Sequence, residues 1–133
     1  MADPLTDADF VALAGFRLAL RRFLQFGADA AAGVGLTPKQ HQALLAIRAG
    51  KDRELLVGEL ADQLLLRSHS VTELVDRMVK LDLVHRAEGR ADRRQVTVRL
   101  TSKGEQLLNG LAEVHRAELR RLRPLLAELM AKL

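Results

Sequence analysis

The chain has no cysteine, no tryptophan and no tyrosine among its 133 residues, and it has only three prolines. Without cysteine it can form no disulfide, no thiolate nucleophile, no cysteine-based zinc site and no thiol redox sensor. No run of apolar residues approaches the roughly 20 that a membrane-spanning helix needs. The first residues, Met1 to Pro4, also lack the basic start of a secretory signal. We therefore expect a cytoplasmic protein with no membrane partner.

The sequence also lacks the local patterns of enzymes and metal sites. It has no glycine-rich phosphate-binding motif, since the glycines at 33–35 mark the end of a helix. The histidines are scattered, with no pair at ligand spacing: His41, His69, His85 and His115. We therefore expect a binding protein that is not an enzyme and holds no cofactor. A metal-sensing dimer that uses residues distant in sequence stays open.

What is present is an ordinary globular composition, 48% hydrophobic and 29% charged, with an uneven charge distribution. The net charge is +4, and the short segment 84–100 carries much of it. This segment holds two acidic residues, Glu88 and Asp92, against five arginines: Arg86, Arg90, Arg93, Arg94 and Arg99. Such a cluster suits contact with phosphates. A solvated basic hairpin with no partner explains the composition equally well.

Apolar periodicity predicts long helices at both ends of the chain. The first runs from Leu5 to Ala32, with Thr6 or Asp7 as its N-cap, and its apolar face is wider than a small monomer needs. That width suggests burial against a partner. The last helix of the chain begins after an N-cap at residue 101 or 102. Pro124 should break or kink this helix and leave 125–133 as a separate tail helix.

The middle of the chain reads as a helix, 38–49, followed by a helix-turn-helix and a hairpin. Thr37 caps the first helix, and 53–56 is a brief strand or an extended link. Short helices at 57–64 and 68–81 flank a three-residue turn, and the second buries a stripe that ends at Leu81. Ser70 and Glu73 have capping-box spacing, with Ser68 as the alternative cap. Segments 83–86 and 95–100 alternate around a glycine loop, as hairpin strands do.

The fold class is therefore mainly α with a small β-hairpin wing. The run 71–86, VTELVDRMVKLDLVHR, and the run 91–104, ADRRQVTVRLTSKG, closely resemble the MarR family of bacterial regulators. The family pattern has V-T-x-L-V-D-R-L, then G-L-V-x-R, then D-x-R, then L-T-x-x-G, and the match covers about 36–108. Asp82 and Leu65 stand where the family favours glycine, and Leu56 stands where a capping hydroxyl is common.

The resemblance implies a homodimer that binds double-stranded DNA and regulates transcription. Residues 1–35 and 101–133 would be dimerisation helices, and residues 36–100 a winged helix-turn-helix lobe. We expect a repressor that binds an inverted-repeat operator. Family members often respond to small, frequently aromatic anions bound between the dimer helices and the DNA-binding lobe, so the resemblance leaves a small-molecule effector open, without assigned residues. We interpret Phe16, Phe23 and Phe26 as core and dimer contacts. The competing interpretation is a winged-helix module that binds another protein.

The resemblance places the start of the 68–81 helix in the major groove, where five residues would meet base edges or phosphates: Ser68, His69, Ser70, Thr72 and Glu73. Glu73 could instead only close the capping box, and His69 could simply be exposed. For Asp76 and Arg77 we expect a local or inter-protomer salt bridge rather than a role in DNA reading.

In the wing, Arg90 could enter the minor groove, and Arg93 and Arg86 would contact phosphates. Asp92 would orient Arg94 through an ion pair, although that pair could have a purely structural role. Arg67, at the turn, is a weaker candidate for phosphate contact, as is Lys39.

Overall fold

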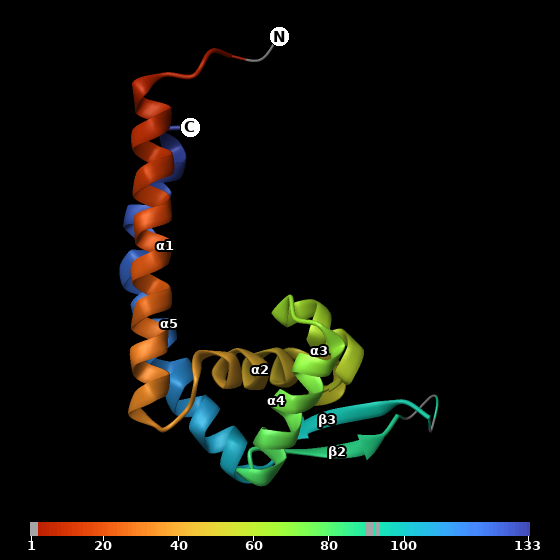
Figure 1. Ribbon diagram of the computed structural model, residues 1–133. Coiled ribbons are helices and arrows are strands. Elements are labelled where there is room, and N and C mark those ends of the chain that lie inside the picture. The colour runs from red at the N-terminus through yellow and green to blue at the C-terminus, as the bar shows by residue number, and fades with distance from the viewer. Residues whose placement is uncertain (1–2, 90–91, 93) are drawn as a thin grey trace.

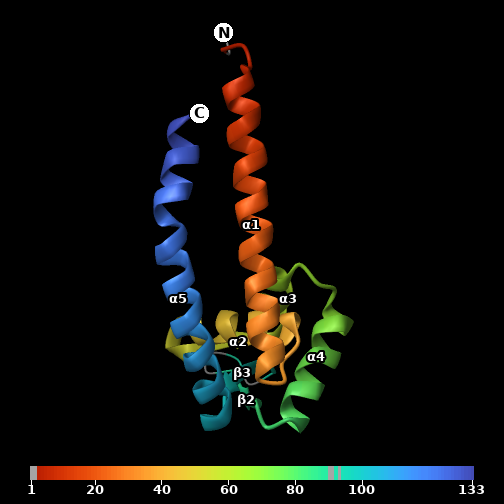
Figure 2. The ribbon, with the colours of Figure 1, turned by 90° about the vertical axis from the view of Figure 1, so that its left-hand side faces the viewer.

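The computed structural model describes residues 3–89, 92 and 94–133. Two long helices, α1 (Asp7–Gly33) and α5 (Ser102–Ala131), run antiparallel beside each other and form a stalk. The rest of the chain forms a lobe at one end of this stalk, and both termini lie at the other end (Figures 1 and 2). At 1.5 Å per residue, α5 is about 45 Å long. The stalk therefore extends well beyond the lobe.

The two stalk helices differ from the prediction at their ends. Thr6 caps α1 as expected, since its Oγ1 accepts from the Asp9 backbone N at 3.2 Å and its own N donates to Asp9 Oδ2 at 2.9 Å. The helix therefore begins at Asp7, and Leu5 lies outside it. The break predicted at Pro124 is wrong, because α5 continues through this residue to Ala131. Leu122 and Leu129 are buried on either side of it and hold the helix in place.

The lobe contains three helices and a small sheet. Helices α2 (Pro38–Ala49), α3 (Val57–Leu64) and α4 (Ser68–Lys80) follow α1, with a short 3-10 turn, η1 (Lys51–Arg53), after α2. Strands β1 (Glu54–Leu56), β2 (Val84–Glu88) and β3 (Val96–Leu100) form an antiparallel sheet in the order β1-β3-β2. The open choice at 53–56 is thus settled as a strand, with Leu55 opposite Val98.

The hydrophobic core joins the lobe to the base of the stalk. Its fully buried side chains come from every helix of the lobe and from the sheet, and include Leu44, Ile47, Leu60, Val71, Met78 and Val98. Ala31 of α1 and Leu108 and Leu111 of α5 belong to the same cluster. Leu81, predicted to end the buried stripe of α4, is instead 45% exposed, because the helix ends at Lys80 and the chain turns there. The base of the stalk is therefore anchored in the lobe.

Candidate nucleic-acid interface

Helix α4 begins with its backbone amides open. Arg67 is its N-cap residue, and no side chain in the described part of the chain caps it. The first backbone bond runs from Val71 N to Arg67 O at 3.1 Å, so the three preceding N–H groups have no partner within the helix. The caps predicted at Ser70 and Ser68 are both wrong, because Ser68 already has helical geometry. An uncapped helix start attracts anions through its free N–H groups and its dipole.

The first two turns of α4 gather the predicted reading residues on one outward face. Four of the five side chains are exposed to solvent: Ser68, His69, Thr72 and Glu73. The fifth, Ser70, is half-buried. Thr72 Oγ1 donates to Ser68 O at 3.0 Å, which leaves its lone pairs free to accept. Glu73 caps no helix among the described residues, and its exposed carboxylate can accept from an amino group. The face thus offers both donors and acceptors.

Two left-handed residues stand at the positions where the family favours glycine. Leu65, in the turn before α4, has φ 55° and is 90% exposed. Asp82, just after α4, has φ 58°, a conformation that Asp adopts more easily than most residues. Asp82 O accepts from Thr101 Oγ1 at 2.6 Å, and Leu83 O accepts from Thr101 N at 3.0 Å. The end of α4 is thereby tied to the start of α5.

The wing contains the ion pair predicted from its D-x-R pattern. Arg94 Nε and Nη2 donate to the two Asp92 carboxylate oxygens, each at 3.2 Å, and Arg94 N donates to Asp92 Oδ1 at 2.9 Å. These bonds from Arg94 hold the pKa of Asp92 below its ordinary value. The Arg94 side chain remains 91% exposed. Arg90 and Arg93 lie outside the described residues.

Arg86 has a partner that the sequence did not reveal. Its guanidinium pairs with the Asp76 carboxylate, which joins β2 of the wing to the exposed face of α4. Asp76 thus forms a salt bridge within the chain, as expected, but with a residue of another element, and the salt bridge expected of Arg77 stays a prediction. At the other end of the sheet, Arg99 Nη1 bonds Glu54 Oε2 at 3.1 Å and links β3 to β1. The wing is thus attached by ion pairs both to α4 and to β1.

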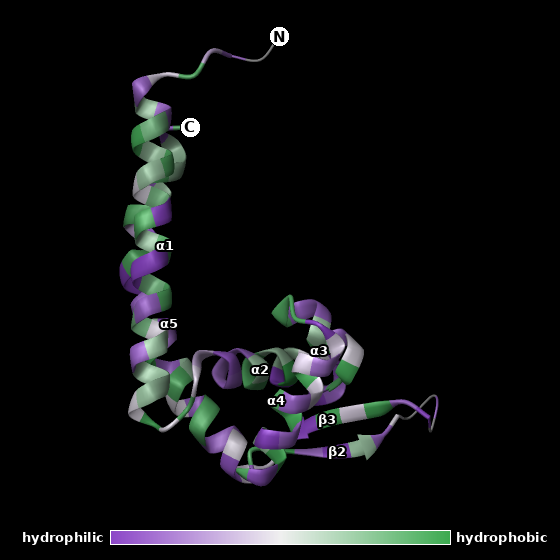
Figure 3. Cartoon of the chain, viewed as in Figure 1, coloured by the Kyte–Doolittle hydropathy of each residue, from purple (hydrophilic) through white to green (hydrophobic). Residues whose placement is uncertain are grey.

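The elements that carry the described candidate residues lie in the lobe, around the end of α2 that points away from the stalk. In Figure 1, α3, the start of α4 and strands β2 and β3 extend away from α1 and α5, whereas the C-terminal end of α4 lies beside the start of α5. The hydropathy colouring in Figure 3 shows hydrophilic residues on α4 and on the strands, in contrast to the mostly hydrophobic upper part of α1. Arg67, exposed at the start of α4, adds a cation that no described side chain pairs.

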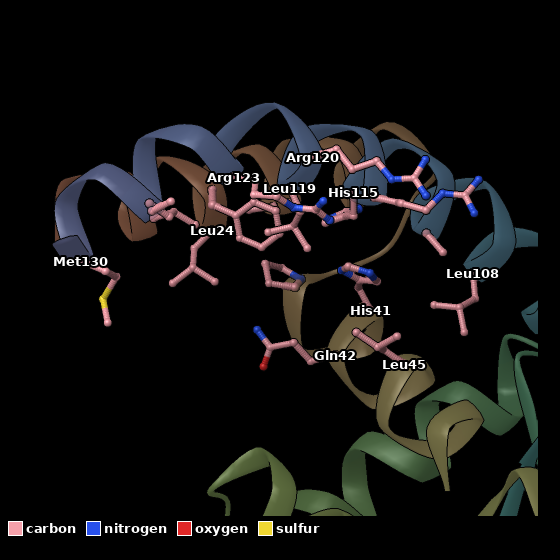
Figure 4. A pocket seen from close by; sticks show the side chains of 18 residues that line it. Leu24, His41, Gln42, Leu45, Leu108, His115, Leu119, Arg120, Arg123 and Met130 are labelled. Atoms are coloured by element: carbon pink, nitrogen blue, oxygen red, sulfur yellow. The ribbon is translucent and has the colours of Figure 1, made fainter. Parts of the chain in front are cut away.

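A second feature is a cavity of about 900 Å³ in the corner between the stalk and α2 (Figure 4). Apolar residues from all three helices line it, among them Phe23, Leu45, Leu119 and Met130. Three arginines of α5, Arg116, Arg120 and Arg123, supply its charge, and no carboxylate is among its described lining residues. Sequence reasoning missed this cavity, because its walls come from segments up to 107 residues apart.

Two histidines meet inside this cavity. The ring centroids of His41, from α2, and His115, from α5, are 4.7 Å apart. His115 Nδ1 donates to Leu111 O at 2.6 Å, and Phe23 and Phe26 of α1 pack edge-on against the same ring. Burial, and secondly the charge of His115, lower the pKa of His41.

In the part of the chain that the structure describes, none of the helices could span a membrane.

The fold and the interface define a class: a helix-turn-helix followed by a basic β-hairpin is a winged helix-turn-helix protein. The sequence of residues 34–95 matches the model of the MarR family. This match, over slightly less than half of the chain, agrees with the resemblance that the motifs indicated, and the predicted fold class is confirmed.

Three relatives illustrate the similarity. The HTH-type transcriptional regulator MhqR of Bacillus subtilis is 32% identical over 94 residues, which cover 71% of this chain and 63% of MhqR. The crystal structure of AbsC, a MarR family transcriptional regulator from Streptomyces coelicolor, has a TM-score of 0.72 at 22% identity, covering 90% of this chain and 81% of AbsC. A mutant MarR from E. coli complexed with operator DNA has a TM-score of 0.70 at 22% identity, covering 87% and 83%. The chain spans less than two thirds of the length of the curated relatives it matches.

Proposed function

We propose that this protein binds double-stranded DNA sequence-specifically and regulates transcription as a repressor. The observation that carries the proposal is the open start of α4, where free amides and exposed polar side chains stand next to an arginine-bearing wing. A structural neighbour of the same fold, the E. coli MarR mutant, was crystallised with operator DNA. In this proposal the protein occupies a promoter and blocks it.

The reading residues divide by chemistry. His69, Ser70 and Thr72 lie where hydroxyl or imidazole groups would meet base edges in the major groove, and Glu73 would accept from a cytosine amino group. Ser68, at the very start of α4, would contact a phosphate, with its backbone N–H directed outward. Arg90 and Arg93 complete the proposed set on sequence grounds alone.

Arg94 and Arg86 of the wing would contact DNA while each stays paired with a carboxylate of this chain. A guanidinium has five N–H donors, and Arg94 gives two of them to Asp92, which leaves three for a phosphate or a groove edge. Arg86 would contact a phosphate beside Asp76 in the same way. Arg67 has no such partner in the described part of the chain, so it is the best candidate for a pure phosphate contact.

We further propose that the protein acts as a homodimer joined through 1–35 and 101–133. Large apolar side chains stand exposed along both stalk helices, including Phe10 at 59%, Leu24 at 56% and Met130 at 57%. Contiguous apolar surface of this extent marks an interface with another protein. Two recognition helices in a symmetric dimer would read inverted half-sites about one DNA turn, roughly 34–36 Å, apart. A monomer at micromolar concentration in sedimentation experiments would rule this out.

Equilibrium binding to genomic-fragment DNA at several salt concentrations tests the DNA-binding proposal. Binding should weaken steeply with salt, and Arg67→Ala should weaken it for all sequences and reduce the salt slope by about one. Arg121→Ala is the matched control, since Arg121 pairs with Glu118 on the stalk, and it should behave like wild type. If the chain retains no DNA at any salt concentration, the winged-helix module binds a protein instead.

The cavity supports the remaining part of the proposal, a small-molecule effector. Its apolar walls and three lining arginines, Arg116, Arg120 and Arg123, suit an aromatic carboxylate, with the ring against the leucines and the charge on a guanidinium. Benzoate is a simple probe, and calorimetry with the full chain should detect its binding. Arg120→Ala should weaken that binding, whereas its neighbour Arg121→Ala should not. Equal effects of the two substitutions would refute the site.

A further inference from the structure

The junction between α2 and α5 holds the only contact between histidine rings in the described residues. His41 stands in the first turns of α2, which belongs to the DNA-binding lobe. His115 stands one turn beyond Leu111, where α5 leaves the hydrophobic core of the lobe and enters the stalk. The two rings therefore meet where the lobe and the stalk join.

Among the described residues that line the cavity around this pair, none is a carboxylate that would stabilise a positive charge through an ion pair. The cations on α5 that line the same cavity are Arg116, Arg120 and Arg123. From α1 the cavity receives only Phe23, Leu24, Gly27 and Ala28, and from α2 the uncharged Pro38, Gln42 and Leu45 beside His41 itself. Protonated imidazoles would therefore repel each other and the nearby guanidinium groups.

His115 has little room to move away from the contact. A Cβ at Gly27 would lie 2.8 Å from His115 Nε2, so the ring is pressed against the backbone of α1. Its other nitrogen is bonded to Leu111 O. Farther along α2, the Arg48–Glu105 ion pair, 3.1 Å, links the same two helices. When the pair is protonated, relief must therefore come from movement of the His41 end of α2, with the Arg48 end as the pivot.

We propose that the His41–His115 contact is a proton-sensitive joint, which opens in mild acid, changes the angle between lobe and stalk, and weakens binding to DNA. In a dimer this angle sets the separation of the two recognition helices, on which the match to operator half-sites depends. The DNA effect rests on the proposed function, but the opening of the joint does not. Closed and open forms differ in proton affinity, so acid favours the open form.

Acid should favour the open joint, because the closed joint disfavours a proton on His41. Because burial and His115 lower the pKa of His41 in the closed form, the open form binds more protons below about pH 6.5, the ordinary histidine value. The closed joint is thus fully favoured above that pH and loses ground as the pH falls. One histidine excluded from protonation gives at most about a tenfold shift one pH unit below its ordinary pKa.

The first test is histidine NMR on the full chain without DNA. The chain has four histidines, so single His→Gln variants assign their ring signals. At pH 8, ring protons of His41 and His115 should show a mutual Overhauser effect, which should vanish on acidification with the midpoint of the His41 ring signals. A His41 midpoint that is unchanged in His115→Gln, or an Overhauser effect that persists at pH 5.5, would overturn the joint.

The second test is DNA affinity from pH 8 to 5.5 at constant ionic strength, with a duplex selected at pH 8. Wild-type affinity should fall by up to about tenfold relative to His41→Gln, and His115→Gln should flatten the profile in the same way. The control His85→Gln, in exposed β2, should keep the wild-type profile. Identical profiles for wild type and His41→Gln would overturn the DNA effect. Failure to bind DNA at any pH would count against the proposed function, while the NMR still decides the joint.

Discussion

Replacing Gly104 by alanine should destabilise the protein, although alanine is the better helix former. Gly104 lies in the first turn of α5, where a Cβ would be 2.1 Å from the Leu83 carbonyl oxygen and 3.5 Å from Leu100 Cγ. The Leu83 oxygen cannot simply retreat, because it accepts from Thr101 N at 3.0 Å. The L-T-x-x-G pattern thus ends in glycine because two backbone segments touch there.

The magnitude follows from three contributions. Forced overpacking costs about 1–3 kcal/mol, and loss of the Thr101–Leu83 bond about 0.5–1.5 kcal/mol. The helix preference of alanine returns only about 0.5–1 kcal/mol. We therefore expect Gly104→Ala to lower the free energy of unfolding by about 2–3 kcal/mol. It should also displace the wing, because strand β2 begins at Val84, directly after Leu83.

Gly110→Ala, on the same helix, is the matched control. A Cβ at Gly110 meets no atom within 4 Å, so alanine there should stabilise the protein by about 0.5–1 kcal/mol. Urea unfolding of both variants at one protein concentration should thus separate them by about 3 kcal/mol, because any coupled association is then held constant. If Gly104→Ala proves as stable as Gly110→Ala, the proposed close contact between α5 and the wing is wrong.

Three further substitutions give sharp expectations. Leu65→Gly should raise the free energy of unfolding by about 0.5–1 kcal/mol in urea, since it relieves a left-handed leucine whose side chain packs on nothing; a loss would mean that the turn is not left-handed. Pro124→Ala should raise it by about 1–3 kcal/mol in the same assay, since α5 is continuous there; destabilisation would instead support a break. Asp92→Ala should leave stability almost unchanged, because the pair is exposed, yet weaken DNA binding in a titration, since it releases Arg94 from its orientation. Because the Asp92 pKa is lowered, the pair persists above the ordinary aspartate value, 3.8, and is lost only as the pH falls through the lowered pKa, so Arg94 should contribute equally from pH 5 to 8.

Local chemistry was predictable from the sequence wherever it was decided within a few residues. Thr37 caps α2 as predicted from its hydroxyl directly before Pro38. Thr37 N donates to Gln40 Oε1 at 3.0 Å, and Gln40 N donates to Thr37 Oγ1 at 3.1 Å. The Asp92–Arg94 pair likewise follows from two side chains that are two residues apart. Asp82 adopts the left-handed geometry of the glycine that it replaces, because its short polar side chain tolerates it.

The misses arose where distant residues decide the structure. The residues next to Arg86 in the sequence do not indicate that it forms a salt bridge with Asp76 of α4. Pro124 is tolerated because buried leucines on both sides bind α5 to its neighbour, a contact with a segment about 100 residues earlier. The N-cap residue of α4 was predicted wrongly for a local reason. Arg67, Ser68 and Ser70 follow one another closely, and sequence spacing alone does not show which of them precedes the first helical residue. The cavity and its histidine pair depend on the packing of three helices.

Selection of bound duplexes from a randomised pool, with wild-type protein and with Thr72→Ala, tests most directly whether the first two turns of α4 read base sequence in DNA. We expect wild type to recover an inverted repeat with half-sites about one helical turn apart, and Thr72→Ala to relax the preference at one base pair of each half-site. Recovery of no common sequence by wild type, or of an identical sequence by both proteins, would contradict this role of α4.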